Sequence, residues 1–414
     1  MRTIAIIGGG AAGMGAARAL AGKDVRVLLL EAEGRLGGRA WTVRSEGMPL
    51  DLGCGYLHSA DRNPWVEIAR EVGLKVDRRP PRWQQQYRNL GFAPEEQRAA
   101  RAAFDAFAQR LYRDPPRSDR AGDLLDPDGR WTPYIEALSG YINGAEFGSV
   151  SVADYLAYDA AATDENWRVR EGYGALVVAG LPAGIEVRLN TPVTTIDHRD
   201  RRLRLETPRG ILEADAAIVT VSTAVLANGG LRFRPELPAK REAAAALPLG
   251  LADKCFLALA DGHGIDPNTH LIGNPHDAMT GSYQLLPLGR PVIEGFFGGM
   301  AARALESEGA AGMMASAINE MAALLGSDIR KYARPLVASG WGQLSSFGGS
   351  YSHALPGRAA ERARLAEPVD DRLFFAGEAC SENDFSTAHG ALASGVAAAV
   401  RVLQAFSDGG GRPR

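Results

Sequence analysis

The sequence opens with a glycine-rich turn between a strand and a helix, and this turn constrains the fold more than any other feature. Residues 3–30 contain a β-branched run, a small-residue stretch and a second apolar run, a pattern typical of strand, helix and strand. Gly8, Gly10 and Gly13 satisfy G-x-G-x-x-G at the first junction. They permit a tight turn, backbone approach to a pyrophosphate, and packing of helix on strand. With the helix N-terminus as an anion site, the segment predicts dinucleotide binding.

Two further features favour FAD over NAD as the dinucleotide. Glu31 ends the second strand, where a carboxylate accepts hydrogen bonds from ribose hydroxyls. Residues 36–40 follow closely and contain a glycine pair and Arg39, whose guanidinium offers paired donors to a phosphate. A simple nicotinamide dehydrogenase does not need this second element. A glycine-rich turn that binds no ligand would not explain why the strand, the helix and Glu31 all stand at the spacing that a dinucleotide-binding unit requires.

Composition and charge exclude several classes of function. The 414 residues include 46 Lys and Arg against 49 Asp and Glu, a net charge of −3, whereas binders of nucleic acids or anionic membranes usually carry a basic excess. Cys54, Cys255 and Cys380 form no C-x-x-C pair, so neither a disulfide framework nor a metal site is expected. No apolar stretch is expected to span a bilayer, the best candidate being 390–399. We expect a soluble, cytoplasmic protein with no nucleic-acid partner and no membrane anchor.

The remaining chain alternates between helical and strand-rich segments, and its length predicts more than one domain. Helices are predicted at 94–113, 175–179, 312–325 and 390–406, the first with an apolar face of Ala99, Ala103, Phe104, Phe107 and Leu111. Strands are predicted at 187–189, 193–196, 203–207, 216–221, 254–259, 292–297 and 371–376. We predict two interleaved domains: one of residues 1–60, 169–245 and 341–414 that binds the dinucleotide, and one of residues 61–168 and 246–340 that binds the substrate.

The segment after the second strand also carries a family resemblance. Residues 31–39, Glu-Ala-Glu-Gly-Arg-Leu-Gly-Gly-Arg, resemble the E-A-x-x-R-x-G-G-R signature of flavin-containing amine oxidases. That family includes monoamine, polyamine and L-amino-acid oxidases and the flavin-dependent histone lysine demethylases. The resemblance extends over nearly the whole chain. It implies an α/β fold in which a Rossmann-like FAD-binding domain is interleaved with an α+β substrate-binding domain, the amine oxidase or glutathione-reductase-2-like fold.

The resemblance assigns cofactor roles to several separated motifs. The backbone of residues 51–58 would line the flavin ring, Val193 would contact the adenine, and Glu378 would lie near the ribityl phosphate. Residues 386–395 resemble the family's C-terminal motif, whose helix would point its positive end at the flavin. The predicted cofactor-binding residues are Gly8, Gly10, Ala12, Gly13, Glu31, Ala32, Arg35, Gly38, Arg39, Gly53, Cys54, Gly55, Tyr56, Val193, Gly377, Glu378, Thr387 and Ala388.

Four residues are predicted to be catalytic. Strand alternation places Lys254 on a face with apolar neighbours, an unusual position for a cation that a snorkelling or edge lysine would also explain. The resemblance makes it the active-site lysine, which holds a water against flavin N5. Trp341 and Tyr351 flank a motif that resembles the family's W…GSYS stretch, and Tyr351 would form one wall of an aromatic slot for the amine. Many amine oxidases carry a second tyrosine at the position of Thr387. The threonine form found here resembles the histone demethylase branch.

The implied activity is the oxidation of an amine by hydride transfer to flavin N5. The imine would hydrolyse to an aldehyde or ketone, and O2 would reoxidise the flavin and give H2O2. Monoamine oxidases attach FAD through a cysteine at the position of Ser350, so we expect non-covalent FAD here. A dehydrogenase or desaturase, an L-amino-acid oxidase and a non-catalytic binding protein of the same fold stay open as alternatives. The choice of amine and the oligomeric state cannot be read from the sequence.

Overall fold

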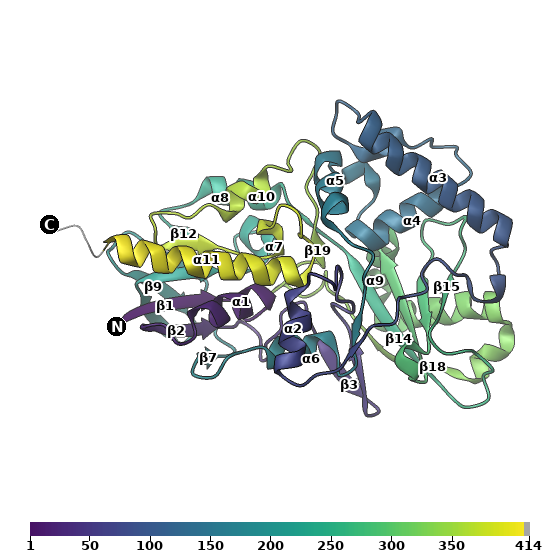
Figure 1. The fold of residues 1–414 in the computed structure, drawn as a ribbon, viewed down its shortest axis with the longest axis horizontal. Helices are drawn as coiled ribbons and strands as arrows, with labels where there is room; N and C mark the ends of the chain where they lie inside the picture. Colours follow the sequence, from purple (N-terminus) through teal and green to yellow (C-terminus); the bar gives the residue numbers. More distant parts are fainter. Residues whose placement is uncertain (410–414) are drawn as a thin grey trace.

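The computed structural model describes residues 1–409 and has two lobes, one of which contains both the first strands and the last described helix (Figure 1). This lobe is built on a parallel sheet in the order β20-β11-β1-β2-β7. Its strands are β1 (Arg2–Ile7), β2 (Val25–Leu30), β7 (Glu186–Arg188), β11 (Ala216–Val219) and β20 (Leu373–Phe375). The first and last segments of the chain therefore fold together.

Two helices cover one face of the parallel sheet, α1 (Ala11–Leu20) and α11 (Ala388–Gly409), and they pack against each other (Figure 1). Glycines allow this close contact. A Cβ on Gly15 would lie 2.2 Å from a carbonyl oxygen of α11, and a Cβ on Gly395 would lie 1.9 Å from a carbonyl oxygen of α1. Small residues in these helices thus reflect packing between two backbones.

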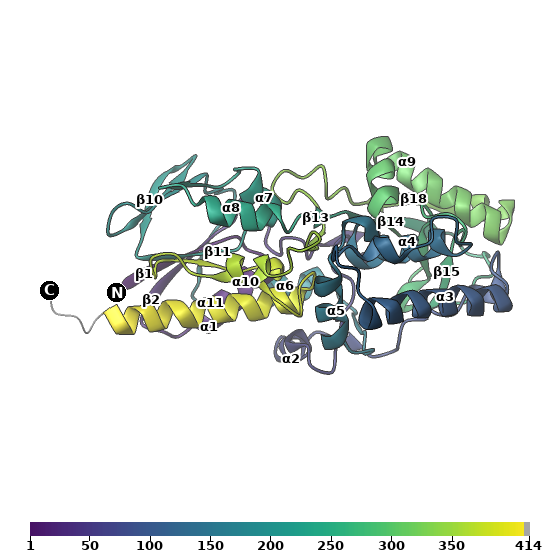
Figure 2. The same cartoon turned by 90° about the horizontal axis from the view of Figure 1, so that it is seen from above.

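The opposite face of the parallel sheet packs against a smaller sheet and three short helices (Figure 2). Ile7, Leu30 and Phe375 contribute to this core, which explains why the strands are apolar on both faces. The smaller sheet has the order β10-β9-β8-β12. The elements are β8 (Thr195–Asp197), β9 (Leu203–Thr207), β10 (Gly210–Ala214), β12 (Arg232–Arg234), α7 (Thr223–Ala227), α8 (Pro238–Ala245) and α10 (Glu361–Ala366).

The second lobe is an antiparallel sheet in the order β15-β16-β17-β14-β18, with a helical layer. Its strands are β14 (Ala252–Leu259), β15 (Thr269–Ile272), β16 (Ser282–Leu285), β17 (Val292–Gly298) and β18 (Ala333–Ala338). One face packs against α9 (Gly299–Leu325), which is interrupted at Gly309 with φ 75°. The other helices of the lobe are α3 (Pro94–Arg113), α4 (Thr132–Asn143) and α5 (Val152–Ala161), which share a core of their own.

The remaining elements are short. They are the strands β3 (Thr42–Ser45), β4 (Met48–Asp51), β5 (Val76–Asp77), β6 (Arg168–Val169), β13 (Leu249–Gly250) and β19 (Tyr351–Ser352), the helices α2 (Pro64–Glu71) and α6 (Tyr173–Ala179), and the 3-10 turns Tyr87–Asn89, Ala121–Leu124, Phe147–Ser149, Pro287–Gly289, Ser327–Lys331 and Glu378–Cys380. The predicted α/β fold is confirmed, and the domain bounds stay a prediction.

Several local predictions were wrong. In α3, Phe107 and Leu111 are buried as predicted and Ala103 and Phe104 pack against the same core, but Ala99 is exposed and its neighbour Ala100 is buried instead. Val193 lies before β8, not within a strand, and β10 was not predicted. The helix predicted from residue 312 is the second half of α9. The first half was not predicted, because Gly309 interrupts the helical pattern between the two halves.

The expectation that no apolar stretch is long enough to span a membrane was also wrong. By length and composition alone, residues Ala388–Asp408 of α11 could cross a bilayer, with a mean hydropathy of 1.3 over the best window and 39% of that window buried. The apolar candidate was limited to residues 390–399, whereas α11 runs from Ala388 to Gly409 and the qualifying stretch includes Arg401. Its contact with α1 accounts for the apolar residues on its buried side, and the absence of a membrane anchor stays a prediction.

Candidate active site

One cavity of about 1160 Å³ runs between the two lobes and brings most of the predicted site residues together. At one end it is lined by the glycine-rich turn before α1, and at the other by β14–β17 and the helices of the second lobe. All four predicted catalytic residues line it, as do all but two of the predicted cofactor residues. The exceptions are Gly13 and Arg35.

The nucleotide end fits a pyrophosphate. Gly8 has φ 112°, and a Cβ on Gly13 would lie 2.1 Å from the Gly8 carbonyl oxygen, so this turn requires both glycines. Helix α1 has no side-chain cap at Gly10 and no acidic residue in its first turn among residues 1–409. Its N–H groups therefore remain for an anion in the cavity that Ala12 also lines.

Glu31 lies at the end of β2, as predicted, and its carboxylate is oriented by the backbone. It accepts hydrogen bonds from the N–H groups of Gly9 at 2.6 Å and Glu33 at 2.8 Å. Burial raises the pKa of Glu31, while these two hydrogen bonds and Arg35 act in the opposite direction. A carboxylate with remaining lone pairs at this place is suited to ribose hydroxyls.

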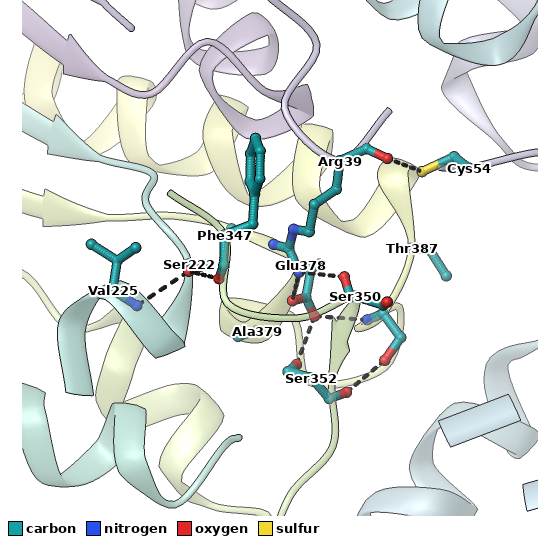
Figure 3. Close-up of polar contacts among 12 residues, drawn as sticks. Arg39, Cys54, Ser222, Val225, Phe347, Ser350, Ser352, Glu378, Ala379 and Thr387 are labelled. Atoms are coloured by element: carbon teal, nitrogen blue, oxygen red, sulfur yellow. Dashed lines mark hydrogen bonds and ion pairs between the residues drawn. The ribbon is translucent and has the colours of Figure 1, made fainter. Parts of the chain in front are cut away.

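Of the two arginines in the signature, Arg39 lines the cavity and Arg35 does not. Arg35 donates to the Gly38 carbonyl at 2.8 Å and lies over the Trp41 ring at 4.3 Å, so it supports the glycine pair from outside the cavity. Arg39 lines the cavity, but its Nη1 donates to Glu378 at 2.9 Å and to the Ser350 carbonyl at 2.8 Å (Figure 3). Part of its donor capacity is therefore committed within the protein.

Glu378 is the centre of the polar cluster in Figure 3. Besides Arg39, it accepts hydrogen bonds from the Ser352 hydroxyl at 2.6 Å and from the Ser386 N–H at 3.0 Å. Burial alone would raise the pKa of Glu378, but Arg39 and Ser352 hold it below its usual value. The cluster joins three segments of chain that meet at the cavity wall.

The Lys254 ammonium is surrounded by the Glu294 carboxylate, the Asp51 carbonyl and Gly55. Its Nζ lies 3.1 Å from Glu294 Oε1 and donates to the Asp51 carbonyl at 3.2 Å. A Cβ on Gly55 would lie 2.6 Å from this Nζ, so the glycine makes room for it. The ammonium has three N–H donors, and these contacts occupy two of them, which leaves one for a water in the cavity.

Glu294 is itself shared between two cations. Arg168 Nη1 donates to its second oxygen at 2.8 Å, and the Arg168 guanidinium lies 4.2 Å from the centre of the Tyr56 ring. Burial would raise the pKa of Glu294, but Arg168 and Lys254 lower it to about 2. Sequence reasoning missed both residues, although a glutamate within the apolar run of β17 was as anomalous as Lys254.

Trp341 and Tyr351 both line the cavity, and each donates a hydrogen bond to a backbone carbonyl. Trp341 donates from Nε1 to the Leu52 carbonyl at 3.1 Å, which fixes the segment leading to Gly53. Tyr351 donates to the Tyr141 carbonyl at 2.7 Å, and burial raises its pKa, so its hydroxyl stays protonated. Its ring is thus fixed as one wall of the cavity.

Thr387 lines the cavity, but its hydroxyl is occupied. It donates to the Asp384 carbonyl at 2.6 Å and accepts from the Gly390 N–H at 3.0 Å, the contact of a helix N-cap on α11. His58, which was not predicted, also lines the cavity, and its Nδ1 lies 2.6 Å from Asn166 Oδ1. Burial lowers the pKa of His58 to about 4, so it is neutral near neutral pH.

Comparison with known proteins decides the family. The model of the flavin-containing amine oxidoreductases matches residues 11–127 and 84–403. The chain belongs to this family. It is 29% identical to polyamine oxidase 4 of Oryza sativa subsp. japonica, over 96% of this chain and 88% of that one, and 28% identical to polyamine oxidase 2 of Arabidopsis thaliana, over 98% and 90%.

A more distant relative and a solved structure agree with this assignment. Lysine-specific histone demethylase 1 homolog 2 of Oryza sativa subsp. japonica is 26% identical over 97% of this chain and 57% of that one. The structure of putrescine oxidase bound to putrescine superimposes with a TM-score of 0.78 at 18% identity, over 97% and 99% of the two chains, and shows the shared fold. This amine oxidoreductase is thus an enzyme acting on CH–NH or CH–NH2 groups, with non-covalent FAD as its cofactor.

Proposed function

We propose that this amine oxidoreductase is an oxidase of small-molecule amines that uses O2. When bound, FAD accepts a hydride equivalent from the carbon next to the amine nitrogen and passes the electrons to O2, which gives H2O2. The released imine hydrolyses to an aldehyde or ketone. The relatives named polyamine oxidases put diamines and polyamines among the first compounds to test.

Residues of the chain would position the reactants. The glycine turn, Glu31 and the N-terminus of α1 would hold the dinucleotide, and the segment around Gly53 and Gly55 would line the flavin. The ring of Tyr351 gives the amine an apolar wall, and it favours a neutral nitrogen or a cation on its face. Lys254 would hold a water with its remaining donor.

One observation carries the proposal: the same cavity contains an uncapped helix N-terminus with its glycine turn and, at the other end, a buried lysine beside an aromatic wall. Anaerobic mixing of the yellow protein with a panel of amines and amino acids tests it. We expect an amine to bleach the flavin, and re-aeration to give one H2O2 per substrate oxidised. Bleaching without peroxide would identify a dehydrogenase, and preference for amino acids an amino-acid oxidase.

The cellular location is a separate proposal. We propose that the protein is cytoplasmic, which is supported by three cysteines that form no disulfide among residues 1–409. Detection of the untagged protein in a fractionated source cell tests this, and recovery in a secreted or membrane fraction would contradict it.

A further inference from the structure

The substrate end of the cavity has a floor made by one face of the antiparallel sheet. Alternate residues of four strands line it, namely Ala252, Lys254, Glu294, Phe296, Ser282, Gln284, His270 and Ile272. The register places Phe296 between Lys254 and Ser282, and Gln284 between Glu294 and His270. Because neighbouring strands are evenly spaced, the backbone of Ser282 lies about 10 Å from that of Lys254 across the floor, and Gln284, two residues further along β16, lies about 12 Å away.

The polar groups on the far part of this floor are neutral. His270 Nε2 lies 2.8 Å from Ser282 Oγ, and burial lowers the pKa of His270 to about 4, so the ring is uncharged near neutral pH. Within residues 1–409, the side-chain amide of Gln284 makes no hydrogen bond, and the buried Nδ1 of His270 has no partner. Gln284 and Ser282 are only partly buried and line the cavity, so the Gln284 amide and the hydrogen-bonding capacity that the Ser282 hydroxyl keeps beyond its contact with His270 are available to a ligand.

The floor and the α4 face of the cavity offer no free counter-ion for a second ammonium group. Among the described floor residues and those of α4 that line the cavity, Glu294 is the only carboxylate, and Lys254 and Arg168 already occupy both of its oxygens. The other acids on this side of the cavity, Asp105, Asp159 and Asp164, are exposed to solvent. A cation held above the floor would therefore lose its hydration and gain no free charge.

The roof opposite the floor is aromatic. Tyr134, Leu138 and Tyr141 of α4 line the cavity at helical spacing. The Tyr141 ring lies 5.9 Å from that of Phe296, and its hydroxyl donates to the Thr280 carbonyl at 2.8 Å, so it is not available to a ligand. The space between roof and floor fits an apolar chain that ends in a group able to donate and accept hydrogen bonds.

We propose that Gln284 and Ser282 form a subsite for a neutral hydrogen-bonding group, and that the substrate is an amine with an amide or hydroxyl about 10 Å from its reacting end rather than a second ammonium. The inference rests on the proposed function and narrows its substrate class. An amide matches the two side chains because it has both a donor and an acceptor, as the Gln284 amide and the Ser282 hydroxyl do.

A matched series of amines tests the subsite on the FAD-loaded enzyme. The rate of anaerobic flavin bleaching is measured with butyl, hexyl and octyl amines, the corresponding terminal diamines, and the mono-N-acetyl diamines. At the best chain length, we expect the acetylated compound to exceed the plain amine about 10-fold in the ratio of bleaching rate to dissociation constant, and the diamine to fall below both. If the diamine is preferred, the neutral subsite is wrong while the oxidase stands. If no amine bleaches the flavin, both proposals are overturned.

Variants of Gln284 and Ser282 test whether these two residues cause the preference for the acetylated amine. In the double variant Gln284→Leu and Ser282→Ala, we expect the preference for the acetylated amine to vanish while the value for the plain amine persists. Thr269→Val is the matched control, because Thr269 points away from the floor on β15 and its hydroxyl donates to the Asp266 carbonyl at 2.9 Å. Flavin content shows that each variant is folded. A preference that survives in the double variant assigns it to other residues and overturns the subsite.

Discussion

The two ends of the cavity are built in different ways. The nucleotide end is formed mainly by backbone groups at the edge of a parallel sheet, and it consists of glycines, a helix N-terminus and Glu31 within residues 8–31. The substrate end is formed by side chains of strands and helices that are far apart in sequence, such as Arg168 and Glu294, which are 126 residues apart. Local geometry therefore determines cofactor binding, whereas charge pairing between distant segments determines the reactive surface.

The largest expected effect tests the backbone character of the nucleotide end. In Gly13→Val, the new Cβ would lie 2.1 Å from the Gly8 carbonyl oxygen, and neither backbone can move without separating α1 from β1. We expect loss of bound FAD, measured as the ratio of flavin to protein absorbance after purification. Gly148→Ala is the control, since its Cβ would have no heavy atom within 4 Å, and it should retain FAD. A yellow Gly13→Val protein would contradict the glycine-turn interpretation.

The next effect lies at the substrate end and should leave the nucleotide end intact. Lys254→Met removes the ammonium that Glu294 and the Asp51 carbonyl hold, so a water near the flavin loses its anchor. We expect flavin reduction or reoxidation to slow by about 100-fold with FAD retained. Stopped-flow measurement of the two half-reactions checks this, and wild-type rates in both would remove Lys254 from the mechanism.

Glu294→Gln tests the charge pairing that distinguishes the substrate end. Removing this carboxylate leaves Arg168 and Lys254 without their shared counter-ion, which should cost about 3 kcal/mol of unfolding free energy. In the Lys254→Met background, the added effect of Glu294→Gln on the half-reactions should be small if Glu294 acts by positioning Lys254. Additive kinetic losses would instead give Glu294 a role of its own.

The same carboxylate predicts a dependence of stability on pH. Its pKa in the folded protein is about 2, below the ordinary value of 4.5, so the unfolded chain takes up the proton first as pH falls. The stabilisation is therefore complete above pH 4.5 and is lost progressively toward pH 2, by about 3 kcal/mol in total. Denaturant titrations at pH 6 and pH 3 should show a larger loss in wild type than in Glu294→Gln, and equal losses would contradict the assignment.

The sequence predicted the nucleotide end well because its signals are local. The first strand, the helix and the second strand lie within residues 2–30, against a predicted 3–30, Glu31 directly follows β2, and the glycines lie where the motif places them. At the substrate end, the readable local signals were single charged residues in apolar strands, Lys254 in β14 and Glu294 in β17, and only the first was used. Glu294 lies beside Lys254 through the pairing of β14 with β17, and Arg168 reaches Glu294 from a segment 126 residues earlier in the chain. No local sequence pattern encodes these contacts. The assignment of Arg35 to cofactor binding came from the motif, and the structure places this side chain behind the glycine pair.

The smallest effect concerns Thr387, which belongs to both ends because α11 starts beside the substrate and packs on the nucleotide lobe. Its hydroxyl caps α11, so Thr387→Val should lower the unfolding free energy by about 1 kcal/mol. Asparagine also caps helices but has no hydroxyl, which makes Thr387→Asn the informative comparison. If the cap is the function, Thr387→Asn restores both stability and the rate of flavin bleaching. If bleaching stays slow while stability recovers, the hydroxyl takes part in the reaction, as the sequence prediction of a catalytic Thr387 requires.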